Sequence, residues 1–200
     1  NGYGYVDLGL PSGTRWATCN VGSTTPEGYG NYYAWGETTP KDYYDWSTYR
    51  YCNGSSRTLT KYCTCSSYGN NGFTDNLTTL ESSDDAATAN WGAGWRMPTQ
   101  EEWQELVTNT VGSGMIINGV DGWLFTASNG NGLFLPFAGY RSYGTHFKAG
   151  SSSYSWTSTL HHDNPGYAWP AISHPSDSYL YIMYRYYGLT VRPVCSSVEN

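Results

Sequence analysis

The chain has 200 residues and a formal net charge of −6, with only ten Lys and Arg residues against sixteen Asp and Glu residues. This shortage of cations argues against nucleic acid as a partner, because affinity for phosphate groups depends on neutralisation by Lys and Arg. No run of 18 apolar residues occurs, so we expect no membrane insertion by this domain. The 20 tyrosines, nine tryptophans and 24 glycines are typical of a loop-rich, sheet-rich protein whose aromatic side chains also hydrogen-bond.

No repeat, linker or charge block divides the sequence, and we expect one domain over 1–200. Because the chain starts at Asn1 without Met or a signal peptide, we expect a fragment of a longer surface protein. The five cysteines are odd in number. Cys52 and Cys63 could close a hairpin, but no Cys or His pair has zinc-ligand spacing. We therefore predict structural or free cysteines, no metal and no cofactor.

The first half of the chain predicts few regular elements. Residues 1–20 alternate in polarity around a turn at 10–13 and predict two strands. The stretch 40–80 is rich in Tyr, Ser, Thr, Asn and Gly and has no period, which predicts a long insertion loop with some hairpin. Ser83 is expected to cap a short helix over 84–89, with acidic residues in its first turn.

A second helix is predicted over 99–108 by a local signature. Thr99 and Glu102 have the spacing of a capping box, in which each side chain bonds the backbone N–H of the other residue. Pro98 keeps the preceding chain extended. Trp103 and Leu106 recur at helical spacing, so one face of the helix is apolar.

Turn signals are dense after this helix. Asn118-Gly119, Asp121-Gly122 and the 129–132 stretch predict hairpin turns between short strands, which continue to Val194. The Asn and Asp oxygens of these turns could also hold a hard cation such as calcium. We favour the turn interpretation, because each pair has the composition that positive backbone φ angles require.

The stretch 91–107 (WGAGWRMPTQEEWQELV) resembles the helix signature of C-type-lectin-like folds of the formylglycine-generating-enzyme type. It is closer still to a family of secreted domains abundant in gut Bacteroidales, the Fibrobacter succinogenes major paralogous domain type. Further matching motifs lie at 5–22, 33–37, 84–87, 135–136, 139–141 and 191–194. The resemblance implies an α+β, C-type-lectin-like fold with short helices packed on a twisted, mostly antiparallel sheet and with long loops.

The segment 140–187 combines recurrent anchors with stretches that follow no pattern. Residues 170–182 alternate neither as a strand nor as a helix, and two prolines interrupt them. The segment resembles the variable region of diversity-generating retroelement targets, in which the adenines of AAY codons are randomised and the third base stays a pyrimidine. Such codons cannot give Lys, Glu, Gln, Met or Trp, and 170–182 contains none of these. The anchors Trp156, Trp169, Arg185 and Arg192 are predicted to be framework, with both tryptophans substantially buried.

The resemblance implies a non-catalytic adhesin or receptor-recognition domain with a hypervariable C-terminal surface. Its ligand would be a protein or glycan on another cell or host surface, and the domain would lie outside the cell on a lipoprotein, at a pilus tip or on a phage tail. Tyr and Ser also supply the adaptable contact area of antibody paratopes. The predicted ligand-binding residues are Thr145, His146, Phe147, His161, His162, Asp163, Tyr167, Pro170, Ile172, His174, Ser176, Asp177, Tyr179, Tyr181 and Tyr184.

Two alternatives compete with this interpretation. His161, His162 and Asp163 have residue types found in hydrolases, but neighbouring side chains point to different sides of a strand and form no triad by themselves. An enzyme of the formylglycine-generating type requires two cysteines near the C-terminus, where this chain has only Cys195. The other alternative is an invariant structural module of a cell-surface system. We predict no catalytic residues.

Overall fold

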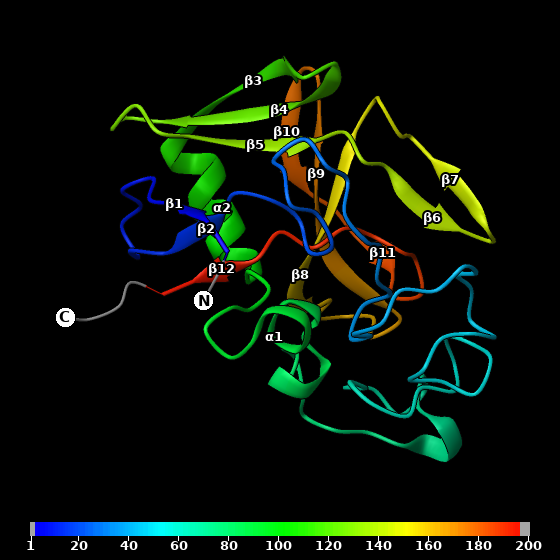
Figure 1. Ribbon diagram of the computed structural model, residues 1–200. Coiled ribbons are helices and arrows are strands. Elements are labelled where there is room, and N and C mark those ends of the chain that lie inside the picture. The colour runs from blue at the N-terminus through cyan, green and yellow to red at the C-terminus, as the bar shows by residue number, and fades with distance from the viewer. Residues whose placement is uncertain (1–2, 197–200) are drawn as a thin grey trace.

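The computed structural model describes residues 3–196 and has an α+β architecture of short helices and mostly antiparallel sheets (Figure 1). The helical elements are η1 (Asn70–Gly72), η2 (Ser82–Asp84), α1 (Ala86–Trp91) and α2 (Gln100–Asn109). The strands are β1 (Tyr5–Val6), β2 (Arg15–Ala17), β3 (Thr110–Ile117), β4 (Val120–Ala127), β5 (Gly132–Pro136), β6 (Tyr140–Ser142), β7 (Thr145–Phe147), β8 (Ser153–Leu160), β9 (Tyr167–His174), β10 (Asp177–Leu180), β11 (Met183–Tyr184) and β12 (Val194–Cys195).

The two ends of the chain meet in one small sheet of order β1-β2-β12. Val6 and Val194 both pair with Trp16, which is fully buried. The strands predicted around the turn at 10–13 are thus confirmed as β1 and β2. Because the middle strand is hydrogen-bonded on both edges, this sheet ties the start of the domain to its end.

Helix α2 follows its sequence signature. The hydroxyl of Thr99 accepts from the N–H of Glu102 at 3.2 Å, and the carboxylate of Glu102 accepts from the N–H of Thr99 at 2.9 Å. Trp103 and Leu106 are fully buried, and the ring of Trp103 meets that of Trp16 edge-on at 5.0 Å. The predicted capping box is therefore confirmed, and it fixes the start of the helix that packs against the β3-β4-β5 sheet.

The sheet of order β3-β4-β5 is built from tight hairpins. Asn118 and Gly119 both have positive φ angles, 49° and 80°, and join β3 to β4 as predicted. Asp121 and Gly122 lie within β4, so the turn predicted there is wrong. Gly122 is instead required by close packing, since an added Cβ would lie 2.2 Å from the ring of Phe134.

A second sheet carries the C-terminal segment. Strand β9 pairs with β8 along one edge and with β10 and β11 along the other, all antiparallel. The patternless stretch 170–182 is therefore mostly a hairpin, with Pro175 at its turn and Pro170 inside β9 opposite Trp156. Periodicity failed here because both faces of β9 are largely covered, so polarity does not alternate along it.

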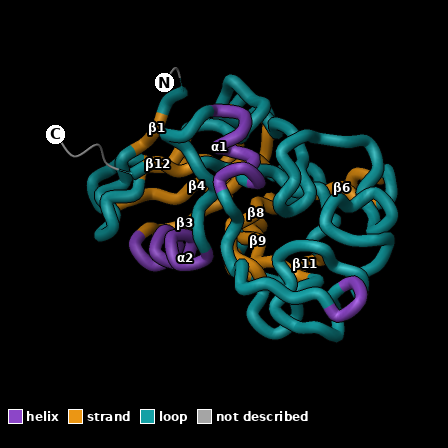
Figure 2. The backbone as a smooth tube through the Cα atoms, turned by 90° about the horizontal axis from the view of Figure 1, so that it is seen from below, coloured by secondary structure: helices purple, strands orange, loops and turns teal. Residues whose placement is uncertain are grey.

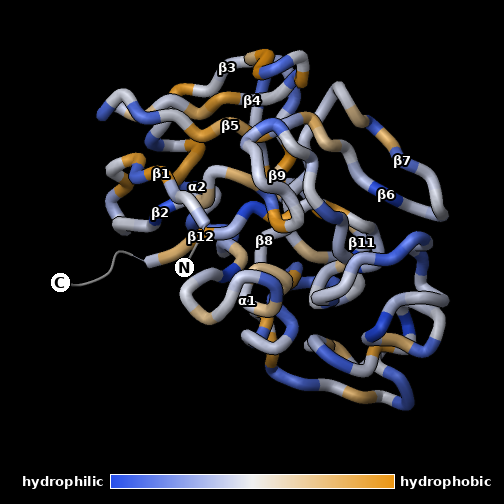
Figure 3. Tube along the Cα trace, in the orientation of Figure 1, coloured by the Kyte–Doolittle hydropathy of each residue, from blue (hydrophilic) through white to orange (hydrophobic). Residues whose placement is uncertain are grey.

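The stretch 40–80 is mainly irregular, as predicted, and appears as the long teal loops of Figure 2. It is hydrophilic over much of its length, in contrast to the apolar strands β4 and β5 (Figure 3). Its cysteines, including Cys52 and Cys63, are free. Helix α1 begins later than expected, because Asp85 rather than Ser83 caps it through the N–H groups of Ala87 and Thr88.

Candidate functional site

An open groove of about 340 Å³ lies on the face formed by β6, β8, β9, β10 and β11. Ile172 of β9 sits in its floor, flanked by its directly opposite neighbours Tyr154 of β8 and Tyr179 of β10, which share its face of the sheet. Seven of the ten lining residues are tyrosines, and none is charged. The lining residues are Tyr140, Tyr154, Tyr167, Ile172, Tyr179, Tyr181, Ile182, Met183, Tyr184 and Tyr187.

Ring-to-ring contacts hold the groove walls in place. Tyr167 and Tyr184 stack with centroids 4.4 Å apart, and Tyr184 contacts Tyr187 at 6.2 Å. Tyr140 contacts both Tyr154, at 4.8 Å, and Tyr187, at 5.5 Å. These contacts restrict the side chains before any ligand arrives, so little rotamer entropy remains to be lost on binding.

Three of the groove tyrosines have raised pKa values. Burial raises the pKa of Tyr154 to about 12, and a hydrogen bond with Tyr184 together with burial raises that of Tyr167 to about 12. Burial likewise raises the pKa of Tyr140. These three phenols therefore stay protonated at physiological pH and can both donate and accept hydrogen bonds, while their rings offer apolar area.

The structure brings together part of the predicted ligand-binding set. Tyr167, Ile172, Tyr179, Tyr181 and Tyr184 line the groove itself. Others lie at its margins: Phe147 stacks on Tyr140 at 5.3 Å, His174 contacts Tyr179 at 5.7 Å, and His161 contacts Tyr167 at 6.3 Å. The remaining exposed members lie on β7, in turns and at the start of β10: Thr145, His146, His162, Asp163, Ser176 and Asp177.

Some predicted positions differ in the structure. Pro170 and Ile172 are buried, because β9 is a central strand, although Ile172 still lines the groove. The ring of His146 turns away from the groove and hydrogen-bonds the carbonyl of Ala138 at 2.7 Å. Trp169 is largely but not fully buried, as predicted, and stacks on His161 at 5.1 Å.

Five groove residues were not predicted: Tyr140, Tyr154, Ile182, Met183 and Tyr187. Tyr140 and Tyr154 belong to β6 and β8, so their contribution depends on how the strands are ordered in space. The abundance of tyrosine in the composition was the only signal for them. Sequence patterns report the period within a strand but not which strands lie beside it.

Arg185, the residue after the groove residue Tyr184, is fully buried. Its guanidinium donates to the hydroxyl of Tyr49 at 2.9 Å and to the carbonyls of Tyr62, Pro165 and Lys61 at 2.9–3.0 Å. It also lies over the ring of Trp35 at 5.0 Å. One side chain thus joins the long 40–80 loop to the β8–β9 turn, which confirms the framework prediction for Arg185.

Trp156 and Arg192 complete the buried framework. The indole N–H of Trp156 donates to the carbonyl of Tyr33 at 2.9 Å. The guanidinium of Arg192 donates to Asn20 Oδ1 at 2.8 Å and to the carbonyl of Ala17 at 3.1 Å. Both side chains are fully buried, as the sequence predicted. They connect the C-terminal segment to the N-terminal third of the chain.

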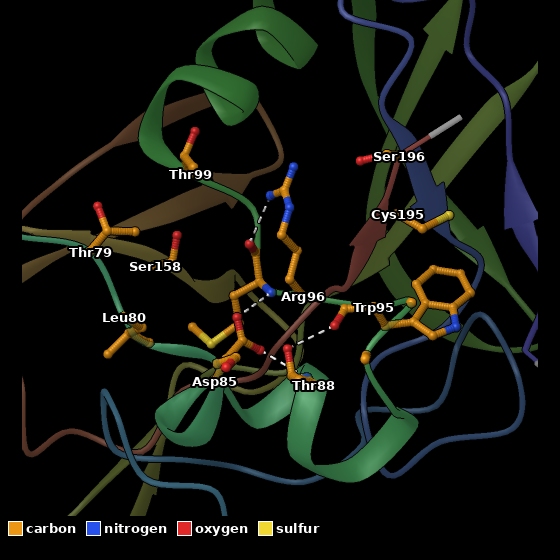
Figure 4. Close-up of a pocket in the computed structure, with 14 residues that line it drawn as sticks. Thr79, Leu80, Asp85, Thr88, Trp95, Arg96, Thr99, Ser158, Cys195 and Ser196 are labelled. Carbon is orange, nitrogen blue, oxygen red and sulfur yellow. Dashed lines mark hydrogen bonds between the residues drawn. The ribbon is translucent and has the colours of Figure 1, made fainter. Parts of the chain in front are cut away.

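A second cavity, of about 420 Å³, lies between α1, the 92–99 segment and β12 (Figure 4). Three of its polar side chains, Asp85, Thr88 and Arg96, are engaged in local bonds. The Asp85 carboxylate accepts from three backbone N–H groups, at 2.8–3.0 Å. The Arg96 guanidinium pairs with Glu102, and the Thr88 hydroxyl donates to the carbonyl of Trp95 at 2.8 Å. These groups support the local fold.

The histidines and turn amides have local roles. His162 and Asp163 form an exposed pair at 2.8 Å in the turn after β8. Asn129 and Asn131 both donate to the carbonyl of Asp7, and Asn118 donates to Glu27, so these amides brace turns. Within residues 3–196, no three His, Cys, Asp or Glu side chains gather as a metal site would require.

No protein-family model, no curated protein and no solved structure matches the chain. Among the described residues, no helix has the length and apolar character needed to cross a membrane.

Proposed function

We propose that this domain is a non-catalytic ligand-binding module that recognises a protein or glycan through the tyrosine-lined groove and its margins. The observation that carries the proposal is the composition of the groove, seven tyrosines with three aliphatic residues and no charge. Rigid aromatic side chains with polar tips supply much of the binding energy in antibody paratopes. All ten groove residues also come from the segment 140–187, which resembles a retroelement variable region.

In this proposal, the surface is diversified by a retroelement while the scaffold stays constant. Tyr179 and Tyr181 are exposed, and each can be exchanged without opening a cavity. Arg185 and Trp156, by contrast, are fully buried and hold the strands in place. Such a module would act outside the cell, on an outer-membrane lipoprotein, at a pilus tip or on a phage tail.

The experiment uses two arrays as probes, one of neutral glycans and one of purified cell-surface ectodomains. We expect binding to at least one array member, and we expect Tyr179→Ser combined with Tyr181→Ser to weaken that binding by about tenfold or more, as for aromatic hot spots. The matched control is Tyr5→Ser, which changes an exposed tyrosine on β1. Binding that both variants retain equally would contradict the proposal, as would the absence of any bound probe.

A further inference from the structure

Strand β3 exposes aliphatic side chains in a way that the groove does not account for. Among the described residues, every large exposed hydrophobic side chain that is not aromatic lies on β3: Val111, with 75% of its surface exposed, Ile116 with 65%, and Met115 with 41%. Exposed apolar residues gathered on one element indicate an interaction surface, whereas scattered ones are ordinary.

The outer edge of β3 is open. Strand β3 is terminal in its sheet and pairs only with β4. In a two-residue hairpin the closing pair, here Ile117 and Val120, exchanges both backbone hydrogen bonds. Alternate residues, namely Gly112, Gly114 and Ile116, therefore direct their N–H and C=O groups away from β4. Within residues 3–196, no other segment forms backbone bonds with these three residues.

This edge also lacks the usual protection. Proteins protect exposed edges with charged residues, proline, bulges or very short strands. Residues 110–120 contain no charged residue and no proline. Strand β3 is eight residues long, and its register with β4 runs through eight consecutive pairs without a bulge. The edge is therefore suited to pairing with another strand.

We propose that β3 pairs antiparallel with β3 of a second copy of this chain, around a two-fold axis at Ser113. A two-fold axis perpendicular to the sheet leaves the same face of β3 on the same side of the joint sheet in both copies. The sequence numbers of two paired residues therefore differ by an even number. With Ser113 opposite itself, Val111 meets Met115 and Gly112 meets Gly114. The outward backbone groups of the two glycines then face each other as a hydrogen-bonded pair.

The second copy is favoured as the occupant by charge and by register. The chain carries a net charge of −6, yet this edge carries none, so self-pairing brings no like charges face to face. A partner selected by charge complementarity would need ionised groups along the edge. The same register also places Ile116 opposite Thr110, so large residues meet apolar or β-branched ones. The resulting dimer would present two grooves and so gain avidity for repeated ligands.

Sedimentation velocity of the 200-residue chain, from micromolar to millimolar concentration, tests the proposal without any ligand. We expect a reversible monomer–dimer equilibrium. Ser113→Glu places two carboxylates opposite each other at the axis and should weaken association by about tenfold or more. The control Thr64→Glu adds the same charge at an exposed position of the 63–68 loop and should leave association unchanged.

A second variant tests the register. In Ser113→Cys, the two introduced thiols would face each other at a non-hydrogen-bonded position, where Cα atoms about 4.5 Å apart suit a disulfide. Mild oxidation should give a dimer linked through residue 113, identified by peptide mass mapping, whereas Met115→Cys faces Val111 and should not link to itself. A chain that stays monomeric throughout would overturn the proposal and leave the edge to a different partner. A dimer unaffected by Ser113→Glu would also overturn it, because another surface would then be responsible.

Discussion

The groove residues and the buried framework residues Trp156 and Arg185 come from the same stretch of chain, 140–187, but their side chains are held very differently. Tyr181 exposes 54% of its surface at the groove rim. Arg185, four residues later, is fully buried and donates four hydrogen bonds, three of them to backbone carbonyls. The comparison teaches that exposed and fully buried side chains can alternate within a few residues of one segment, so the exposed ones can be exchanged at little cost in stability.

The largest difference should appear between two tryptophans. Trp156→Ala removes a fully buried ring and its bond to the Tyr33 carbonyl, and should cost about 3–5 kcal/mol in the free energy of unfolding. Trp169→Ala removes a ring that is largely but not fully buried and stacks on His161, and should cost only about 1–2 kcal/mol. Chemical denaturation of both variants measures the difference. Equal costs would mean that Trp169 supports the framework as strongly as Trp156.

Arg185→Met should cost about 2–4 kcal/mol, because it leaves buried carbonyls and the Tyr49 hydroxyl without a donor. Arg185→Lys keeps the charge but not the planar fork, so it should recover only part of the loss. Thermal unfolding monitored by circular dichroism gives the order of stability. If Arg185→Lys is as stable as the original protein, the charge alone matters and the fork geometry does not.

A smaller, pH-dependent effect is expected at Glu102. Burial opposes its ionisation, but the Arg96 guanidinium and the N–H of Thr99 stabilise the carboxylate, so its pKa in the folded state lies below the ordinary value of 4.5. A carboxyl group whose pKa is lower in the folded than in the unfolded state stabilises the fold at pH values above its unfolded-state pKa. This stabilisation is lost as the pH falls through the folded-state pKa. Glu102→Gln should remove about 1 kcal/mol at neutral pH. Its unfolding free energy should also depend less steeply on pH below 4.5. Parallel pH profiles for the two proteins would contradict this assignment.

The smallest effect belongs to the groove. Tyr179→Ser and Tyr181→Ser should each change the free energy of unfolding by about 0.5 kcal/mol or less, because both side chains are exposed. The same denaturation series measures this change beside that of Trp156→Ala. A loss of several kcal/mol from either variant would place that tyrosine in the framework and weaken the contrast between exposed and buried side chains.

Local signals in the sequence predicted local structure well. The Thr99–Glu102 capping box and the Asn118-Gly119 turn depend on contacts within a few residues, and both are present. The expectation for 170–182 failed because β9 is covered on both faces, which removes the alternation that marks a strand. The turn predicted at Gly122 failed for a related reason, since that glycine serves packing against Phe134 rather than a bend.

The candidate site was predictable only in part. Tyr179, Tyr181 and Tyr184 cluster in the sequence, so their proximity could be anticipated. Tyr140 and Tyr154 reach the groove because β6 and β8 lie beside the C-terminal strands, and no pattern within either strand reports that neighbourhood. Their placement depends on packing between strands that are far apart in the sequence. The hydrophobic periodicity within one strand gives no information about such packing.

The central claim, that an exchangeable surface is combined with a constant framework, is tested most directly by sequencing this locus across isolates. The account predicts that substitutions fall at AAY codons and concentrate at exposed positions of 140–187 such as Tyr179 and Tyr181, while Trp156 and Arg185 stay constant. A groove that is identical in every isolate would contradict the account, as would substitutions spread evenly over buried and exposed positions.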